Sequence, residues 1–132
     1  MHDYGIVIQA RSRASRLPDK VLLPFFDGRS ILQIITGNLL EAFPDVPVCI
    51  ATSTHRSDDR IVAVAEELGA RCVRGSEQDV LSRFLLAVRT LRLRNVVRVC
   101  ADNPFLDTDA LQQLVAAHAE AVDRPAYLSY EV

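Results

Sequence analysis

The sequence has no tryptophan, a single lysine and no long apolar run. No stretch approaches the roughly 20 consecutive apolar residues that cross a bilayer, and no positively charged segment precedes an apolar stretch at the N-terminus. The 15 Lys and Arg residues face 17 Asp and Glu residues, which gives a net charge of −2. Neither a basic surface nor an aromatic stripe is therefore available for a nucleic acid or a membrane, and we expect a soluble, cytoplasmic protein.

The three cysteines form no C-x-x-C motif and no Cys/His spacing. Cys49, Cys72 and Cys100 each lie in a short run with β-branched neighbours, which predicts buried strand residues in a reducing compartment and not a redox or metal site. A chain of 132 residues, 49% of them hydrophobic, can cover one core without disulfides or a structural metal. We therefore expect a single domain, 1–132.

Hydrophobic periodicity alternates along the chain between short β-branched runs and helical spacing. The predicted strands are 4–8, 48–52, 71–73, 96–100 and 126–130. The predicted helices are 30–43, 57–69, 76–93 and 107–122. Their start signals are Ser30, Ser57, a capping box of Ser76 with Asp79, and Asp107 or Thr108, and Gly69 ends the second helix.

This order predicts an α/β fold, a Rossmann-like three-layer sandwich. Alternating strands and helices require right-handed crossovers, so we expect a mainly parallel sheet of about five strands with helices on both faces. In such sheets ligands bind beyond the carboxyl ends of the strands. The loops at 9–24, 52–57, 74–79 and 101–107 are expected to meet there.

The first of these loops contains an unusual group of cations. Arg11, Arg13, Arg16 and Lys20, the only lysine of the chain, fall within ten residues. Guanidinium groups match phosphate oxygens and an ammonium adds a compact charge, so the loop suits a polyphosphate. The segment 9–22 contains no glycine, which excludes a dinucleotide fingerprint and a Walker loop, and a solvated surface loop is the alternative.

Other candidates each have a structural alternative. Asp102 follows an apolar strand and is placed to bind Mg²⁺, or it forms a turn before Pro104. Arg98 is either an ion-pair partner or directed at the site. Thr52, Ser53 and Ser76 contact ribose or base, or they satisfy backbone groups. The remaining candidates, Asp79, Asp107 and His55, are two helix caps and the one histidine beside the second loop.

Four motifs in order resemble the cytidylyltransferases related to spore-coat polysaccharide biosynthesis proteins and to sugar-acid cytidylyltransferases. They are IQARSRASRLPDKVL at 8–22, ATS at 51–53 with Asp58 and Asp59, RGSEQDVLSRF at 74–84 and VVRVCADNPFLD at 96–107. The resemblance implies a nucleotidyltransferase that uses CTP and Mg²⁺. It implies catalytic roles for Arg11, Arg16 and Lys20 on the triphosphate and a metal ligand at Asp102. The implied nucleotide-binding residues are Gln9, Ala10, Arg11, Lys20, Ala51, Thr52, Ser53, Arg74, Gly75, Ser76, Asp79 and Ala101.

The chain departs from the family pattern in two ways. Arg13, Ala14 and Asp19 stand where the family loop usually has Gly, Ser and Gly. Full-length relatives are about twice as long, and their second half carries a further metal carboxylate, much of the sugar pocket and a dimerisation element. The sequence is therefore either a fragment or a member of a short branch.

Such a branch is the cytidylyltransferase domain at the N-terminus of the bifunctional fosfomycin-biosynthesis enzyme, fused to a phosphoenolpyruvate mutase-like domain. This resemblance implies that 1–132 is a cytidylyltransferase domain forming the N-terminal part of a longer bifunctional protein, and that it transfers CMP from CTP to 2-hydroxyethylphosphonate. A phosphonate oxygen is ionised near neutral pH and needs no general base, and the sequence offers no convincing one. Arg13, Arg16 and Arg98 are the candidates for binding this acceptor. Transfer to a sugar acid or spore-coat sugar, a non-catalytic CTP-binding regulatory module, and a homo-oligomer stay open.

Overall fold

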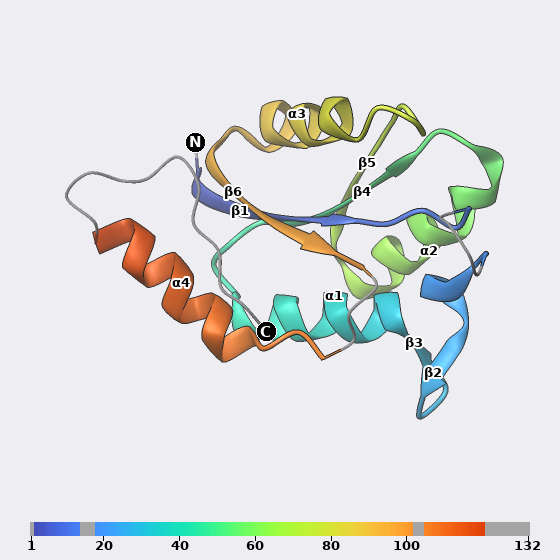
Figure 1. Ribbon diagram of the computed structural model, residues 1–132, viewed down its shortest axis with the longest axis horizontal. Coiled ribbons are helices and arrows are strands. Elements are labelled where there is room, and N and C mark those ends of the chain that lie inside the picture. The colour runs from blue at the N-terminus through green and yellow to red at the C-terminus, as the bar shows by residue number, and fades with distance from the viewer. Residues whose placement is uncertain (1, 14–17, 102–104, 121–132) are drawn as a thin grey trace.

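The computed structural model describes residues 2–13, 18–101 and 105–120. Four parallel strands form the main sheet in the order β5-β4-β1-β6, with β1 between β4 and β6 (Figure 1). The strands are β1 (His2–Gln9), β4 (Val48–Ser53), β5 (Arg71–Gly75) and β6 (Leu93–Cys100). The helices are α1 (Ile31–Ala42), α2 (Asp59–Leu68), α3 (Val80–Leu91) and α4 (Thr108–Glu120).

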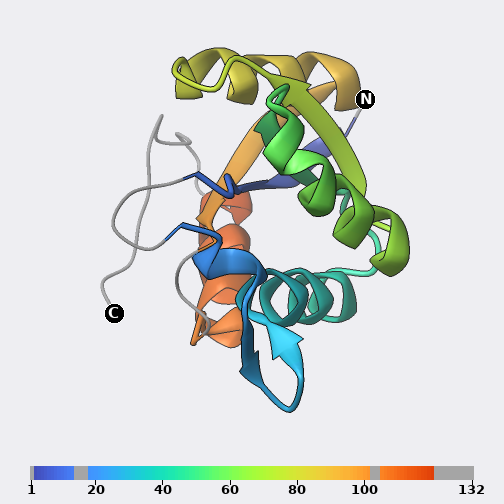
Figure 2. The ribbon, with the colours of Figure 1, turned by 90° about the vertical axis from the view of Figure 1, so that its right-hand side faces the viewer.

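Helices cover both faces of this sheet, which confirms the predicted α/β sandwich (Figure 2). On one face, Ile6, Ile8 and Ile50 pack against α1, α2 and α4. On the other face, Val7 and Cys49 pack against α3. Alternate residues of β1 therefore enter two separate cores, as the two-residue period of a strand requires. The predicted fifth strand, 126–130, lies outside the described residues.

The boundaries of α3 and β6 correct the prediction. The helix ends at Leu91 and not at Leu93, because Arg92 adopts a left-handed conformation (φ 55°) that ends the helix. The strand therefore begins at Leu93 and not at 96. At the start of α3, Asp79 accepts a hydrogen bond from the Ser82 N–H at 3.0 Å, so Asp79 and not Ser76 is the N-cap.

Two other starts agree with the sequence. Ser30 and Gln33 make a complete capping box at the start of α1, and Asp107 accepts from the Ala110 N–H at the start of α4. The helix predicted from Ser57 begins instead as a short 3-10 turn, η2 (Arg56–Asp58), which runs into α2. As predicted, Gly69, with a φ of 78°, ends α2.

The predicted loop at 9–24 contains more structure than expected. It includes a 3-10 turn, η1 (Lys20–Leu22), and it leads into a hairpin of β2 (Pro24–Phe26) and β3 (Arg29–Ser30). Asp27 and Gly28 both have positive φ, as a two-residue hairpin turn requires. The Asp-Gly pair was the signal for this hairpin.

The cysteine prediction holds in part. Cys49 is fully buried, and burial raises the pKa of its thiol to about 12, so it stays protonated. Cys72 is half-buried. Cys100 is exposed, because every second side chain of β6, from Arg94 to Cys100, faces solvent. No helix in the described part of the chain is long and apolar enough to cross a membrane.

Candidate functional site

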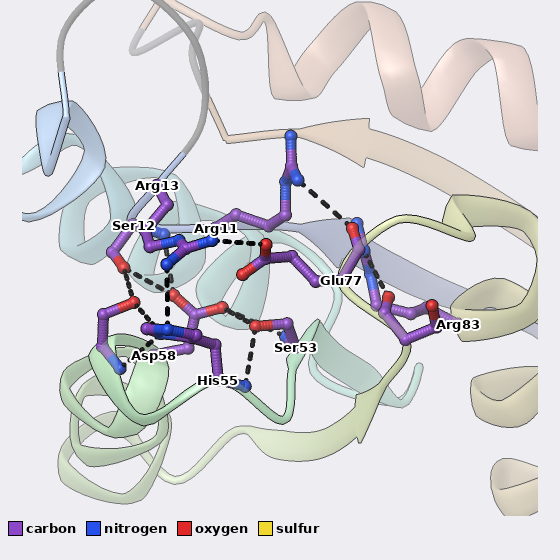
Figure 3. Close-up of polar contacts among 10 residues, drawn as sticks. Arg11, Ser12, Arg13, Ser53, His55, Asp58, Glu77 and Arg83 are labelled. Carbon is purple, nitrogen blue, oxygen red and sulfur yellow. Dashed lines mark hydrogen bonds and ion pairs between the residues drawn. The ribbon is translucent and has the colours of Figure 1, made fainter.

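Three of the four loops predicted to meet at the carboxyl edge of the sheet do so, and 102–104 of the fourth, 101–107, lie outside the described residues. The segment after β1 carries Arg11, Ser12 and Arg13, the segment after β4 carries His55 and Asp58, and the segment after β5 carries Glu77 (Figure 3). Hydrogen bonds join the first segment to both of the others. Residues more than 60 positions apart therefore form one constellation.

Asp58 connects the first two loops from a buried position. Its Oδ1 accepts from the Ser12 N–H at 2.8 Å and from the Ser12 hydroxyl at 2.7 Å. Its Oδ2 accepts from the Ser53 N–H at 3.2 Å and from the Ser53 hydroxyl. Burial by itself raises the pKa of this carboxyl, but the hydrogen bonds from Ser53 and Ser12 outweigh it, so the net pKa is lowered. Asp58 is therefore a carboxylate that fixes the loop, with both oxygens occupied.

The two arginines on either side of Ser12 both reach the loop after β5. Nη1 of Arg11 donates to the carbonyl oxygen of Glu77 at 3.2 Å. Nη2 of Arg13 donates to the Glu77 carboxylate at 2.9 Å, and its Nη1 lies 2.9 Å from Nε2 of His55. The other ring nitrogen of His55 lies 2.8 Å from the Ser57 hydroxyl. Cationic groups thus gather at this edge around one acidic residue.

Arg83, a residue of α3, holds the loop after β5 by hydrogen bonds to its backbone. Although it lies in α3, only 2% of it is exposed. Its Nη1 donates to the carbonyl oxygens of Ser76 and Glu77 at 2.7 and 2.8 Å, and its Nη2 donates to Oε1 of Gln9 at 2.6 Å. Burial and the nearby Arg11 lower the pKa of Arg83. A Cβ on Gly75 would lie 3.0 Å from Cγ of Arg83, so a residue without a side chain makes room for this arginine.

Arg74 contacts the end of β4, the loop after it and the start of α2 through its three guanidinium nitrogens. Nε donates to the Ser53 carbonyl at 2.8 Å, Nη2 donates to the His55 carbonyl at 2.9 Å, and Nη1 pairs with Asp59 at 2.8 Å. In this structure Arg74 therefore holds the loop that presents His55 and Asp58. Its predicted contact with a nucleotide stays a prediction.

The other predicted residues divide into three groups. Ala10, Ala51, Thr52 and Ala101 are buried where β1, β4 and β6 end, and Ser76 accepts from the Asp79 N–H. Lys20 is exposed at the start of η1, and the guanidinium of Arg98 lies over the Phe84 ring, 5.3 Å from its centre. Arg16 and Asp102 fall outside the described residues.

Sequence reasoning assigned no role to Asp58, Glu77 or Arg83, although all three lie inside the motifs that it used. Arg83 had a detectable signal, because it is a lone charge between the apolar positions Val80, Phe84 and Ala87 of one helix. Asp58 had none, since its serine partners lie on other segments. Within the described ranges, no group of three or more His, Cys, Asp or Glu side chains could hold a metal ion.

Comparison with known proteins shows which family has a similar sequence and fold. Residues 5–131 match the family model described as cytidylyltransferase. The chain is 36% identical over 122 residues to the spore coat polysaccharide biosynthesis protein SpsF of Bacillus subtilis, which covers 89% of this chain and 50% of that protein. The chain therefore spans about half the length of this curated relative.

Two solved structures share the fold. A cytidylyltransferase from Leptospira borgpetersenii superimposes with a TM-score of 0.83 at 32% identity, covering 89% of this chain and 49% of that one. A CMP:2-keto-3-deoxy-manno-octonic acid synthetase complexed with CTP superimposes with a TM-score of 0.73 at 21% identity, covering 89% and 47%. The second likeness concerns the fold alone. Four motifs, the parallel sheet and the family match agree, and this chain belongs to the cytidylyltransferase family.

Proposed function

We propose that the protein binds CTP at the carboxyl edge of its sheet and transfers CMP to a small phosphonate. An ionised oxygen of the acceptor attacks the α-phosphorus of CTP. The bond between this phosphorus and the oxygen that bridges to the β-phosphate breaks, and pyrophosphate leaves. The acceptor that we propose is 2-hydroxyethylphosphonate, the substrate of the fosfomycin branch that the sequence resembles.

One observation carries this proposal: Asp58 holds Ser12, and Ser12 places Arg11 and Arg13 together at the edge where ligands of such sheets bind. Transfer of a nucleotidyl group requires mainly positioning and neutralisation of charge, which guanidinium groups supply. We assign Arg11, Arg16 and Lys20 to the phosphates, and Arg13, Arg16 and Arg98 to the acceptor.

The side chains near Arg13 that could act as a general base are already hydrogen-bonded, which favours an acceptor that is ionised before it binds. Of the described residues in contact with Arg13 or Ser12, Asp58 has both oxygens occupied and His55 has a partner at each ring nitrogen. A sugar hydroxyl would need a base to remove its proton, whereas a phosphonate oxygen does not.

A second candidate is transfer of CMP to a sugar or sugar acid. The name of one relative favours it, because that relative is a spore coat polysaccharide biosynthesis protein. Incubation with CTP and each acceptor in turn, with pyrophosphate release as the readout, separates the two. Release with 2-hydroxyethylphosphonate alone supports our proposal, and release with sugars alone overturns it. CTP binding without release for any acceptor identifies a regulatory binding module.

Mg²⁺ is the metal that we propose for this reaction, with Asp102 as a ligand. The described ranges contain no carboxylate cluster of their own for a divalent ion. When bound, Mg²⁺ lowers the charge of a triphosphate and so favours attack by an anion. We expect chelation with EDTA to abolish turnover and Asp102→Asn to raise the Mg²⁺ concentration needed for half-maximal rate. Unchanged turnover in EDTA would exclude this assignment.

A further inference from the structure

Glu77 is the residue on which the cations of this edge converge. Its carbonyl oxygen accepts from Arg11 at 3.2 Å and from Arg83 at 2.8 Å, and its carboxylate accepts from Arg13 at 2.9 Å (Figure 3). In the described structure, the guanidinium of Arg13 is therefore already paired with an anion of the protein itself, the Glu77 carboxylate.

The carboxylate of Glu77 is placed where it can exchange with a ligand. Carboxylates and phosphates accept from the same guanidinium N–H groups, so a phosphate that binds Nη2 of Arg13 takes the place of the Glu77 oxygen that contacts it. The side chains of Arg13 and Glu77 are 53% and 24% exposed, and an ion pair with this exposure is weak. A multiply charged phosphate or phosphonate can therefore displace the carboxylate.

The backbone of Glu77 does not need to move in this exchange. Arg83, which is buried, holds the carbonyl oxygens of both Ser76 and Glu77, so the loop stays in place while the Glu77 side chain rotates. Rotation of a partly exposed side chain is fast compared with enzymatic turnover. The two halves of Glu77 thus have different roles: the carbonyl is structural, and the carboxylate is exchangeable.

We propose that the Glu77 carboxylate occupies the anion-binding position of Arg13 in the free protein and is displaced by a phosphate or phosphonate group of the substrate. This inference rests on the proposed function, and it makes Glu77 a determinant of substrate affinity. Every ligand that binds at Arg13 must displace the carboxylate, which lowers the apparent affinity of that ligand by the small factor that an exposed ion pair allows.

The test compares Glu77→Gln with Asp59→Asn. Both variants remove one negative charge and one exposed ion pair with an arginine at the same edge, but Asp59 pairs with Arg74 and does not contact Arg13. Calorimetric titration with 2-hydroxyethylphosphonate and with inorganic tripolyphosphate gives a separate Kd for each kind of anion. We expect Glu77→Gln to lower the Kd of 2-hydroxyethylphosphonate, the acceptor assigned to Arg13, by about two- to fivefold, the range that loss of an exposed ion pair allows, and Asp59→Asn to change it by less. A gain in affinity cannot arise from misfolding.

Two further measurements identify which ligand binds at Arg13 and whether the gain in affinity depends on Arg13. A gain that CTP shares with tripolyphosphate assigns Arg13 to the nucleotide, whereas a gain seen with 2-hydroxyethylphosphonate assigns it to the acceptor. In an Arg13→Ala background, Glu77→Gln should give no gain, because the exchange passes through Arg13. The inference is overturned if Glu77→Gln matches Asp59→Asn in every arm, if it weakens binding, or if neither the wild type nor Glu77→Gln binds 2-hydroxyethylphosphonate or tripolyphosphate. Failure of pyrophosphate release, by contrast, would count against the proposed function and leaves the tripolyphosphate arm valid.

Discussion

The N–H and the hydroxyl of Ser12 both donate to Oδ1 of Asp58, at 2.8 and 2.7 Å, across 46 positions of sequence. This pair joins the loop after β1 to the loop after β4. Because Ser12 lies between Arg11 and Arg13, the same two hydrogen bonds fix the backbone positions from which both arginine side chains extend. The carboxylate that organises the loop makes no contact with either guanidinium among the hydrogen bonds described.

Asp58→Asn tests this connection through pH. The amide can accept from Ser12 but cannot accept from the N–H and hydroxyl of Ser53, so we expect a loss of about 2–3 kcal/mol in the free energy of unfolding at neutral pH. The folded pKa of Asp58 is lowered, so its stabilisation is full above the unfolded pKa of about 3.9 and is lost as pH falls through the folded value.

Urea denaturation of both proteins from neutral pH to about pH 2 measures this effect, since that window starts above the unfolded pKa and runs in the acidic direction in which the folded pKa is lowered. The difference in unfolding free energy should shrink below about pH 4, as the wild-type carboxyl becomes protonated. A difference that stays constant down to the lowest pH would mean that the charge of Asp58 does not contribute.

Arg83→Met should destabilise the protein and loosen the loop after β5. Methionine fills the space but leaves Oε1 of Gln9 and the carbonyl of Ser76 without their donor, at a cost of about 3 kcal/mol. Arg89→Met, at an exposed position of the same helix, is the matched control and should change stability by less than about 0.5 kcal/mol. Thermal unfolding compares the two variants, and equal effects would remove the role assigned to Arg83.

Two glycine substitutions should have opposite signs. Gly37 lies inside α1 with open space around its missing Cβ, so Gly37→Ala should stabilise by about 0.5–1 kcal/mol through better helix propensity. Gly69 has a φ of 78°, which an L side chain rarely adopts, so Gly69→Ala should destabilise by about 1 kcal/mol. Urea midpoints of the two variants are the measurement, and a shift in the same direction for both would contradict the backbone conformations.

Lys20→Ala should abolish pyrophosphate release while leaving the fold intact. Lys20 is exposed on η1 and supports no core, so its removal takes away a cation for the phosphates and little else. Circular dichroism checks the fold, and Lys20→Arg tests whether a compact ammonium is required. Turnover close to the wild-type rate in Lys20→Ala would exclude the proposed role.

The limits of sequence prediction are clear at particular residues. Ser30 was a reliable helix start because its capping partner, Gln33, is only three residues away. The start of β6 was missed by three residues, because a single left-handed residue at Arg92 ended α3 early and non-glycine residues give little warning of that conformation. The hairpin at 24–30 was missed although Asp27-Gly28 is its usual turn.

Local chemistry determined the element types, the alternation that requires a parallel sheet, and the gathering of the loops at one edge. These follow from periodicity and crossover handedness, which act over short stretches of chain. Only the tertiary structure decided that the Asp58 carboxylate accepts hydrogen bonds from Ser12, that the buried Arg83 donates to the loop after β5, and that the Glu77 carboxylate pairs with Arg13. The first and third contacts join segments that follow different strands, and Arg83 also reaches Gln9, 74 positions away. Contacts between segments so far apart in sequence depend on how the sheet brings them together.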